Sequence, residues 1–435
     1  MQDSGLSAQQ LLSNFIYMAA CFSVNHGTVT TPLVLASTLL DGKVGNVGNC
    51  LLYVATLFSA LVISAPLVSF VGSKWSIITA MSLYCVYIAC FALAIVLRHA
   101  AVLVWTAFIL GSVCGGLAAG VLWTAQGGYF TDSSASLAEA SGAAREDVTS
   151  SLAGSFAAIY LIGEVGSKLL FSALQRTGLE PWRICLLYVM SGFLATLGMT
   201  QTHNFKRDSN GETISPLDKV FTVVSLWRDP LIWLLSPTNL AFGFAAAYMN
   251  SYVNRNFAAT ELGVDFVSSM AAVTAFVAAL LSPVWGALSR VAGKGSSINA
   301  GAVCFFCIPF CILALGCCSG WGWWLILLYV FQGSGRAVYE STNRAMFADF
   351  FPAPDTEGAF ANCMFQSSCS FAISFFLQAF LIGRHLATIV MVLAGLIPVG
   401  YQLAQMLQQR RRRKREEALL QVPSMDYRTS EDQRQ

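Results

Sequence analysis

Apolar residues occur along this chain in long runs that are interrupted by charged residues, proline or glycine rather than by a regular polar face. A run of about 20 apolar residues is long enough to cross the hydrocarbon core of a bilayer as an α-helix. The pattern therefore predicts an all-α, polytopic membrane protein. The twelve helices that we expect to cross the membrane lie at residues 11–36, 46–70, 75–97, 101–130, 150–173, 181–202, 230–254, 265–289, 297–318, 321–348, 360–382 and 386–408.

The composition supports this prediction and excludes a soluble protein. Of the 435 residues, 56% are hydrophobic and 11% are charged, and the mean hydropathy is +0.62. Soluble globular proteins carry about 25% charged residues, so this chain has too few to cover a water-facing surface. The first apolar run has no basic segment before it and no small-residue cleavage site after it, so we interpret it as a membrane helix rather than a signal peptide.

All 13 cysteines fall within the predicted spans, so no disulfide framework is expected. Four of them share one face of the ninth span at helical spacing: Cys304, Cys307, Cys311 and Cys318. No histidine or acidic residue joins them on that helix, and we interpret them as packing residues rather than metal ligands. We expect neither a metal nor a cofactor.

The basic residues predict the orientation, because cytoplasmic loops of membrane proteins carry an excess of lysine and arginine. An even number of spans places both termini on one side. That side receives the run RRRRKR at 410–415 together with Lys74, Arg145, Lys206, Arg207, Lys219, Arg228, Arg290 and Lys294. The opposite side receives Lys43, Arg98, Arg176, Arg183, Arg255 and Arg384. We predict that both termini are cytoplasmic, in either the plasma membrane or an endolysosomal membrane.

The longest internal polar segment, residues 203–220, divides the spans into two sets of six. We expect a first half at 1–203, a cytoplasmic linker at 204–229, a second half at 230–408 and a basic tail at 409–435. Within the linker, helical spacing suggests either a short amphipathic helix on the membrane face or an ordinary loop; the residues are Leu217, Val220, Phe221, Val224 and Trp227. The tail could attract anionic lipid or serve only as a positively charged anchor.

Charged side chains inside the spans mark candidate functional residues, because each costs roughly 2.5–3.5 kcal/mol to insert. Glu164 and Lys168 are four residues apart on the fifth span and can neutralise each other. Arg336, Glu340 and Arg344 form an i, i+4, i+8 ladder on the tenth span. We expect Arg336 to pair with Glu164 across the helices. Such a network could hold two bundles together or could form a gate or a substrate site.

His26 lies in the first span and also has two interpretations. It could titrate and couple transport to protons, or it could donate a hydrogen bond to a neighbouring carbonyl and keep its charge. No acidic partner for it is evident in the sequence.

A loop segment, "GALSRVAGKG" at 286–295, is similar to the G-x-L-x-D-R-x-G-R motif of the major facilitator superfamily. Gly286, Leu288, Gly293 and Lys294 match, while Arg290 stands where that family has an acid. "APLVSFVGSKW" at 65–75 occupies the equivalent place in the first half. Because a phosphate-binding loop needs glycine at 288 and serine or threonine at 295, we exclude an ATP-driven pump.

The segment at 65–75 and two further segments together resemble a narrower group, the Unc-ninety-three (ion channel regulatory protein) family of that superfamily. The first is "GVLWTAQGGYF" at 120–130, in the fourth span. The second, at 335–351, is Gly335 with "RAVYESTNRAMFADFF" after it, and "EGAFAN" comes shortly afterwards. The resemblance implies a twelve-helix facilitator fold of two six-helix halves, in which spans 1, 4, 7 and 10 line a central cavity. The candidate substrate-binding or gating residues are then Asn25, His26, Trp123, Gln126, Glu164, Lys168, Asn250, Arg336, Glu340, Asn343 and Arg344.

The resemblance implies two classes of function, because members of this family are described as channel regulators, as receptor trafficking partners or as presumed transporters. The first hypothesis is a secondary transporter of a small solute or ion that works by alternating access. The second is a non-transporting partner of a channel or a membrane receptor. Neither class is an enzyme, and besides membrane lipids we expect no nucleic-acid partner.

The fourth span carries closely spaced glycines that predict tight helix packing. Gly111 with Gly115, and Gly116 with Gly120, are small-xxx-small pairs that allow another helix to approach. We expect Gln126 and the two glycines after it to lie near the cytoplasmic end of a cavity-lining helix.

Overall fold

The computed structural model describes residues 6–205, 221, 223–314, 320–352, 355–381 and 383–420. Helices occupy every predicted span, and the first six spans correspond to α1 Ala8–Leu39, α2 Gly42–Phe58 with η1 Ser59–Ile63 and α3 Ser64–Val71, α4 Ser73–Val96, α5 Ala101–Ser141, α6 Arg145–Arg176 and α7 Pro181–Met199. The last six correspond to α9 Pro230–Tyr248 with η3 Met249–Ala258 and α10 Ala259–Glu261, α11 Val264–Val291, α12 Lys294–Ala314, α13 Ile326–Val338 with η5 Tyr339–Asn343 and α14 Arg344–Phe350, α15 Thr356–Gln378 and α16 Gly383–Leu420.

Ten of the helical segments among the described residues are long and apolar enough to cross a membrane. The two that do not meet this measure are α1 and the α13–η5–α14 segment. Both carry polar residues inside the membrane, "SVNHGTVTT" in α1 and "RAVYESTNR" in the other. A cavity-lining helix can keep such residues because it faces water or other polar groups rather than lipid.

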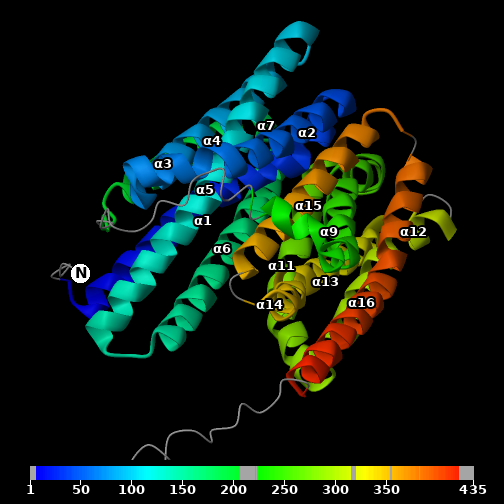
Figure 1. Cartoon of the computed structure of the whole chain (residues 1–435). Helices are drawn as coiled ribbons and strands as arrows, with labels where there is room; N and C mark the ends of the chain where they lie inside the picture. Colours follow the sequence, from blue (N-terminus) through cyan, green and yellow to red (C-terminus); the bar gives the residue numbers. More distant parts are fainter. Residues whose placement is uncertain are drawn as a thin grey trace, which may run out of the picture.

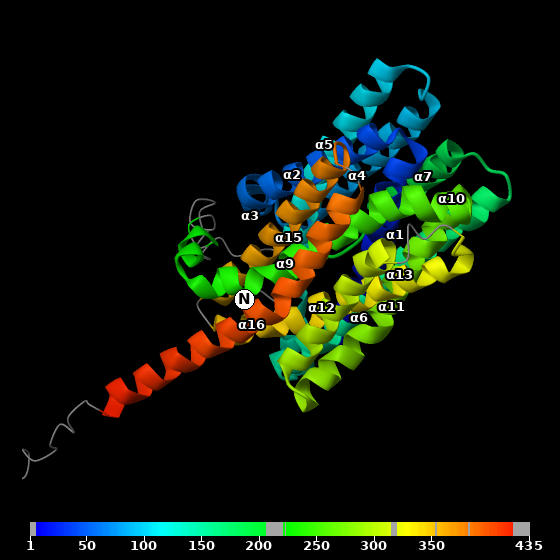
Figure 2. The same cartoon turned by 90° about the vertical axis from the view of Figure 1, so that its right-hand side faces the viewer.

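The helices form two bundles that lie side by side (Figures 1 and 2). In the first, α5 packs on α2 and α4, and α1 packs on α6 and α7; in the second, α9 packs on α15 and α16, and α11 packs on α13. The bundles meet where α2 contacts α15 and α6 contacts α11. We call the side on which α1 begins and α16 ends the terminal side, and the opposite side the far side (Figure 1).

Helix α5 packs against neighbours through the two predicted glycine pairs, which face different helices. A Cβ at Gly111 would lie 2.6 Å from Cys90 Cβ, and one at Gly115 would lie 3.0 Å from the Tyr87 ring, both on α4. A Cβ at Gly116 would lie 2.2 Å from the Leu52 carbonyl oxygen of α2. Gly120 approaches the backbone nitrogen of Ala60 in the same way. The glycines therefore let α5 contact α2 and α4 at backbone distance.

We expect Gly116→Ala to lower the thermal unfolding midpoint of the purified protein, because the new methyl group meets backbone that cannot move without displacing α2. Gly127→Ala is the matched control on the same helix, since no atom lies within 4 Å of the added methyl group. Alanine should leave this position unchanged or stabilise it by up to about 1 kcal/mol. Equal midpoints for the two variants would contradict the close packing at Gly116.

The linker and the tail contact each other on the terminal side. Residues 223–225 are helical and continue into η2 Leu226–Arg228, whereas Leu217 and Val220 of the predicted amphipathic helix lie outside the described residues. Arg411, on the predicted extension of the last span, donates to both carboxylate oxygens of Asp229 at 2.7 and 2.9 Å. Burial raises the pKa of Asp229, but these bonds and one from the Leu231 N–H outweigh it and hold the pKa below its usual value.

The cysteines do not form disulfides or metal clusters within the described part of the chain. Eleven of them are free, including Cys304, Cys307 and Cys311 on α12. No group of three or more metal-binding side chains occurs among the described residues, and Cys318 lies outside them.

Candidate functional site

A cluster of four charged side chains joins the two bundles in the middle of the molecule. Arg336 Nη1 and Nη2 donate to the two carboxylate oxygens of Glu164, each at 3.0 Å. Arg336 Nε donates to Glu340 Oε1 at 2.8 Å, and Lys168 forms an ion pair with Glu164. The contact between Arg336 and Glu164 is the interhelical pair predicted from the sequence. We call these four residues the central cluster.

The central cluster is electrically neutral and is almost closed to solvent. The exposed fractions of the Glu164 and Lys168 side chains are 4% each, against 14% for Arg336 and 24% for Glu340. Buried charges are tolerated in a low-dielectric interior only when they are paired and hydrogen-bonded, and two cations facing two carboxylates meet that requirement. Glu340 is the member that most readily meets water or a solute.

The helix geometry explains why the predicted ladder on the tenth span stops at Glu340. Arg336 and Glu340 pair at i, i+4, but η5 Tyr339–Asn343 is a π-helical turn that accommodates one extra residue. The extra residue rotates the next part of the helix, and Arg344 is exposed with no ion pair to Glu340. The three-residue ladder expected from a regular α-helix is therefore wrong at its last position.

His26 lies within a group of aromatic rings next to the central cluster. Its ring stacks on Phe22 with centroids 5.7 Å apart and contacts Trp123 at 5.4 Å and Tyr160 at 5.2 Å. Tyr160 OH in turn accepts from Arg336 Nη2 at 3.4 Å, so the aromatic group touches the central cluster. His26 Nδ1 is buried without a hydrogen-bond partner among the described residues, and the two interpretations of His26 stay predictions.

The remaining predicted site residues lie in different surroundings. Asn25 is fully buried and donates to the Met81 and Gly192 carbonyls, which ties α1 to α4 and α7. Gln126 is 9% exposed on α5, one turn beyond Trp123. Their roles in binding or gating stay predictions.

Two predicted asparagines lie on π-helical segments of the second bundle. Asn343 donates to Asn239 Oδ1 at 2.8 Å, and Asn239 donates to Gln366, so this amide chain stays within that bundle. Asn250 lies near the far side, in η3, where its backbone carbonyl accepts a hydrogen bond from Ser37 at 3.4 Å. π-Helical turns concentrate at functional sites in proteins, and the central cluster and the far-side contact each contain one.

Polar contacts on the far side join α1 and α2 to η3. Ser251 Oγ donates to Asn46 Oδ1 at 2.6 Å, with both side chains buried. Asn254 Nδ2 donates to the Val34 carbonyl at 3.4 Å. Sequence reasoning missed these residues, because short polar side chains at helix ends resemble ordinary loop-flanking positions.

A second group of far-side contacts joins α6 to α11. Ser268 Oγ donates to the Lys168 carbonyl and the Ser269 N–H donates to Ser172 Oγ, each at 2.9 Å. Arg176 Nη2 donates to Ser269 Oγ at 3.1 Å, and its guanidinium lies 3.7 Å from the centre of the Phe266 ring. All hydrogen bonds and ion pairs that the structure records between described residues of the two bundles lie at the central cluster or on the far side.

The loop motif between α11 and α12 makes contacts on the terminal side. Gly293 has a φ of 82°, which lets the chain turn sharply from α11 into α12. Lys294 donates to the Ala345 carbonyl at 2.9 Å and forms an ion pair with Asp349. A charge pair between loop and helix therefore exists although Arg290, which is exposed, replaces the acid of the motif. Gly286 and Leu288 lie in the last turns of α11.

Two family models match this chain over two separate parts of its length. Residues 38–171 match "Ion channel regulatory protein UNC-93", which includes the segment at 120–130. Residues 240–422 match "Major Facilitator Superfamily", which includes the segment at 335–351.

Curated relatives and solved structures agree with these matches. The chain is 27% identical over 373 residues to Protein unc-93 homolog A of Bos taurus, covering 76% of this chain and 79% of that protein. It is 24% identical to UNC93-like protein 3 of Arabidopsis thaliana, covering 82% of this chain and 78% of that protein. The fold is similar to that of nucleoside transporter NupG, with a TM-score of 0.62, 14% identity and coverage of 92% and 98%. It is also similar to peptide transporter POT in complex with alafosfalin, with a TM-score of 0.65, 12% identity and coverage of 94% and 96%.

Proposed function

We propose that this chain, which matches the UNC-93 ion channel regulatory protein model and the Major Facilitator Superfamily model over separate parts of its length, is a secondary transporter of a small solute or ion. The observation that carries this proposal is the bidentate contact between Arg336 and Glu164. It joins two helices of different bundles in the middle of the molecule, where alternating access requires a contact that can break and form again. A charged solute that competes for Arg336 would weaken this contact and allow the bundles to move.

The distribution of contacts supports an alternating-access cycle. The recorded bonds between described residues of the bundles lie at the central cluster or on the far side, where they include the Ser251–Asn46 and Ser269–Ser172 pairs. This arrangement suits a conformer that is closed on the far side and opens toward the terminal side. With the predicted orientation, in which both termini are cytoplasmic, the terminal side is the cytoplasmic side and this conformer faces inward.

Within this proposal, Glu340 and Arg336 contact the solute and the neighbouring rings shape its path. Glu340 is the most exposed acid of the central cluster, with 24% of its side chain accessible. Tyr160 and Trp123 pack on each other with ring centroids 5.7 Å apart, and Tyr160 OH accepts from Arg336 of the central cluster. Charged and aromatic groups together favour a small polar or charged solute over an apolar one.

A second candidate function is that of a non-transporting regulator or trafficking partner of a channel or a receptor. The description of the family that matches residues 38–171 favours it. Under this alternative, the central cluster would hold the bundles together, and a partner would bind the apolar outer surfaces of the helices. Exposed apolar side chains on α7, including Met190, Phe193 and Leu194, would provide such a surface.

A transport assay separates the two candidates. We expect purified protein in liposomes to move at least one solute of a panel that contains potassium, a nucleoside and a dipeptide, at a rate above that of protein-free liposomes. The nucleoside and the dipeptide reflect the transporters of similar fold. If the liposomes move nothing and the protein purifies with a membrane partner at fixed stoichiometry, the regulator hypothesis replaces the transporter.

A further inference from the structure

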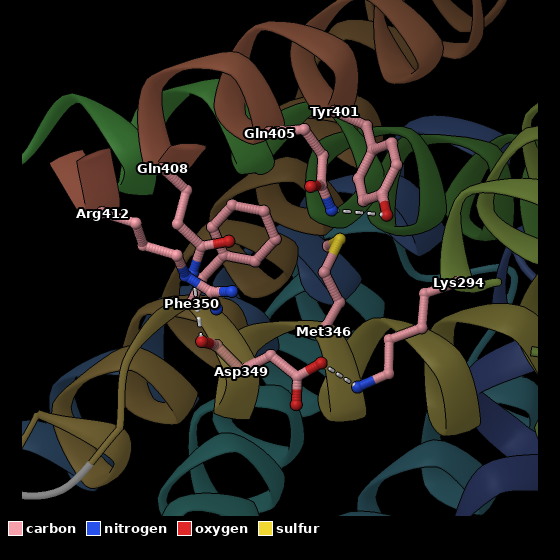
Figure 3. Close-up of a pocket in the computed structure, with 8 residues that line it drawn as sticks. All are labelled: Lys294, Met346, Asp349, Phe350, Tyr401, Gln405, Gln408 and Arg412. Carbon is pink, nitrogen blue, oxygen red and sulfur yellow. Dashed lines mark hydrogen bonds and ion pairs between the residues drawn. The ribbon is translucent and has the colours of Figure 1, made fainter. Parts of the chain in front are cut away.

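A pocket lies on the terminal side of the second bundle (Figure 3), and none of the residues that line it belongs to the central cluster. It lies where α12 begins, where α14 ends and where the last part of α16 passes beside both. Its volume is about 340 Å³. The residues that line it are Lys294, Met346, Asp349, Phe350, Tyr401, Gln405, Gln408 and Arg412.

Arg412 gives this pocket an uncompensated positive charge. Lys294 and Asp349 form an ion pair and neutralise each other on one side (Figure 3). The structure records no ion pair between Arg412 and another described residue. The residue before it, Arg411, differs in this respect, because its guanidinium donates hydrogen bonds to both carboxylate oxygens of Asp229. The pocket therefore has two cations against one carboxylate, and one guanidinium remains available to a ligand.

Hydrogen-bond donors line the same pocket. Gln405 Nε2 donates to Tyr401 OH at 2.8 Å, which leaves the hydroxyl proton of Tyr401 free to point at a ligand oxygen. The start of α12 lies against this ring, because a Cβ at Gly295 would be 2.8 Å from Tyr401 Cε1. The first N–H groups of a helix have no partner within the helix and carry partial positive charge, which favours an anion beside them.

The level of the pocket relative to the last membrane span matches the level at which a phospholipid headgroup lies. Tyr401 lies in the last predicted apolar span and Arg412 lies just beyond it, so the pocket extends across the end of the hydrophobic segment. Met346 and Phe350 provide an apolar wall, whereas Arg412, Lys294 and the tyrosine hydroxyl provide the polar part. A phosphate has several acceptor oxygens and pairs well with a guanidinium.

We propose that this pocket binds a phosphate group, which comes either from a phospholipid whose headgroup is a phosphate monoester or from soluble inorganic phosphate. The phosphate contacts Arg412, the Tyr401 hydroxyl and the start of α12. The apolar wall takes the glycerol and the first part of the acyl chains when the ligand is a lipid. The proposal does not depend on the transport function, because it concerns a different site.

The test compares two arginines of the same run. Binding of water-soluble dioctanoyl phosphatidic acid to the purified full chain in neutral detergent is measured by thermophoresis, with dioctanoyl phosphatidylcholine and inorganic phosphate as the other probes. We expect Arg412→Gln to weaken phosphatidic acid binding about tenfold, the effect of losing one charge-assisted hydrogen bond. Arg413→Gln removes the same charge from an exposed position that does not line the pocket, and it should change the dissociation constant less than twofold.

The outcomes distinguish the pocket from a diffuse attraction and identify the ligand source. Equal losses for Arg412→Gln and Arg413→Gln would show that the basic run attracts anions as a whole, and would overturn the proposal. Equal affinity for phosphatidylcholine and phosphatidic acid would overturn it as well. If inorganic phosphate binds as tightly as phosphatidic acid and depends on Arg412, the ligand is a soluble phosphate. If only the lipid binds, the ligand is a headgroup.

Discussion

Glu164→Gln is expected to destabilise the protein more than Arg336→Gln, and both variants should lose transport. Removing one partner of a buried ion pair costs about 3–5 kcal/mol, because the other charge stays buried without compensation. Glu164→Gln leaves Lys168 without its recorded ion-pair partner and leaves Arg336 paired with Glu340 alone. Arg336→Gln leaves Glu164 paired with Lys168, and Glu340 can reach solvent.

Thermal unfolding of the purified variants measures the order of stabilities, and Arg344→Gln on the same helical segment is the control. Arg344 is exposed and has no ion pair within the described residues, so its replacement should leave the midpoint nearly unchanged. A larger loss for Arg336→Gln than for Glu164→Gln would contradict the charge balance derived for the central cluster.

An apolar replacement separates a structural role of the central cluster from a functional one. Apolar residues of similar volume often replace a buried ion pair without loss of stability. We therefore expect the triple variant Glu164→Leu, Lys168→Met, Arg336→Met to fold with near-native stability and to move no solute. A stable triple variant that transports normally would show that the central cluster only holds the bundles together.

The second large effect is expected from a cross-link on the far side. Asn46→Cys and Ser251→Cys replace two buried side chains whose oxygens are 2.6 Å apart and belong to different bundles. In a background without other reactive cysteines, a short reducible thiol cross-linker should join them and abolish transport, because the far side can no longer open. Reducing the cross-link should restore transport. Uptake that continues in fully cross-linked protein would exclude alternating access at this contact.

A cross-link within one bundle is the matched control for this experiment. The native residues Cys90 on α4 and Cys114 on α5 belong to the same bundle, and these two helices pack closely. Joining them with the same reagent does not restrict movement between the bundles, so transport should persist. Loss of transport in this control would mean that the reagent itself inactivates the protein.

The pattern of apolar residues along the sequence was sufficient to predict most of the membrane helices, because the apolar length that a helix needs to cross a bilayer is a property of that segment alone. About 20 apolar residues are needed for each helix, so ten of the segments could be located from hydropathy alone, whereas α1 and the α13–η5–α14 segment carry too many polar residues to meet that measure. The Arg336–Glu164 pair was also predictable, since a charge inside a span must find an opposite charge and few were available. The glycine pairs on α5 followed from their four-residue spacing, which places the two members of each pair on the same helix face.

The sequence by itself thus determined the membrane class, the positions of the helices and the charges that must meet. The tertiary structure decided that Arg344 leaves the ladder, because a π-helical turn at Tyr339–Asn343 changes the register. It also decided that His26 lies among aromatic rings and that Asn46 meets Ser251. These contacts join residues far apart in the chain, and their partners depend on how whole helices rotate and cross. No spacing along one helix carries that information.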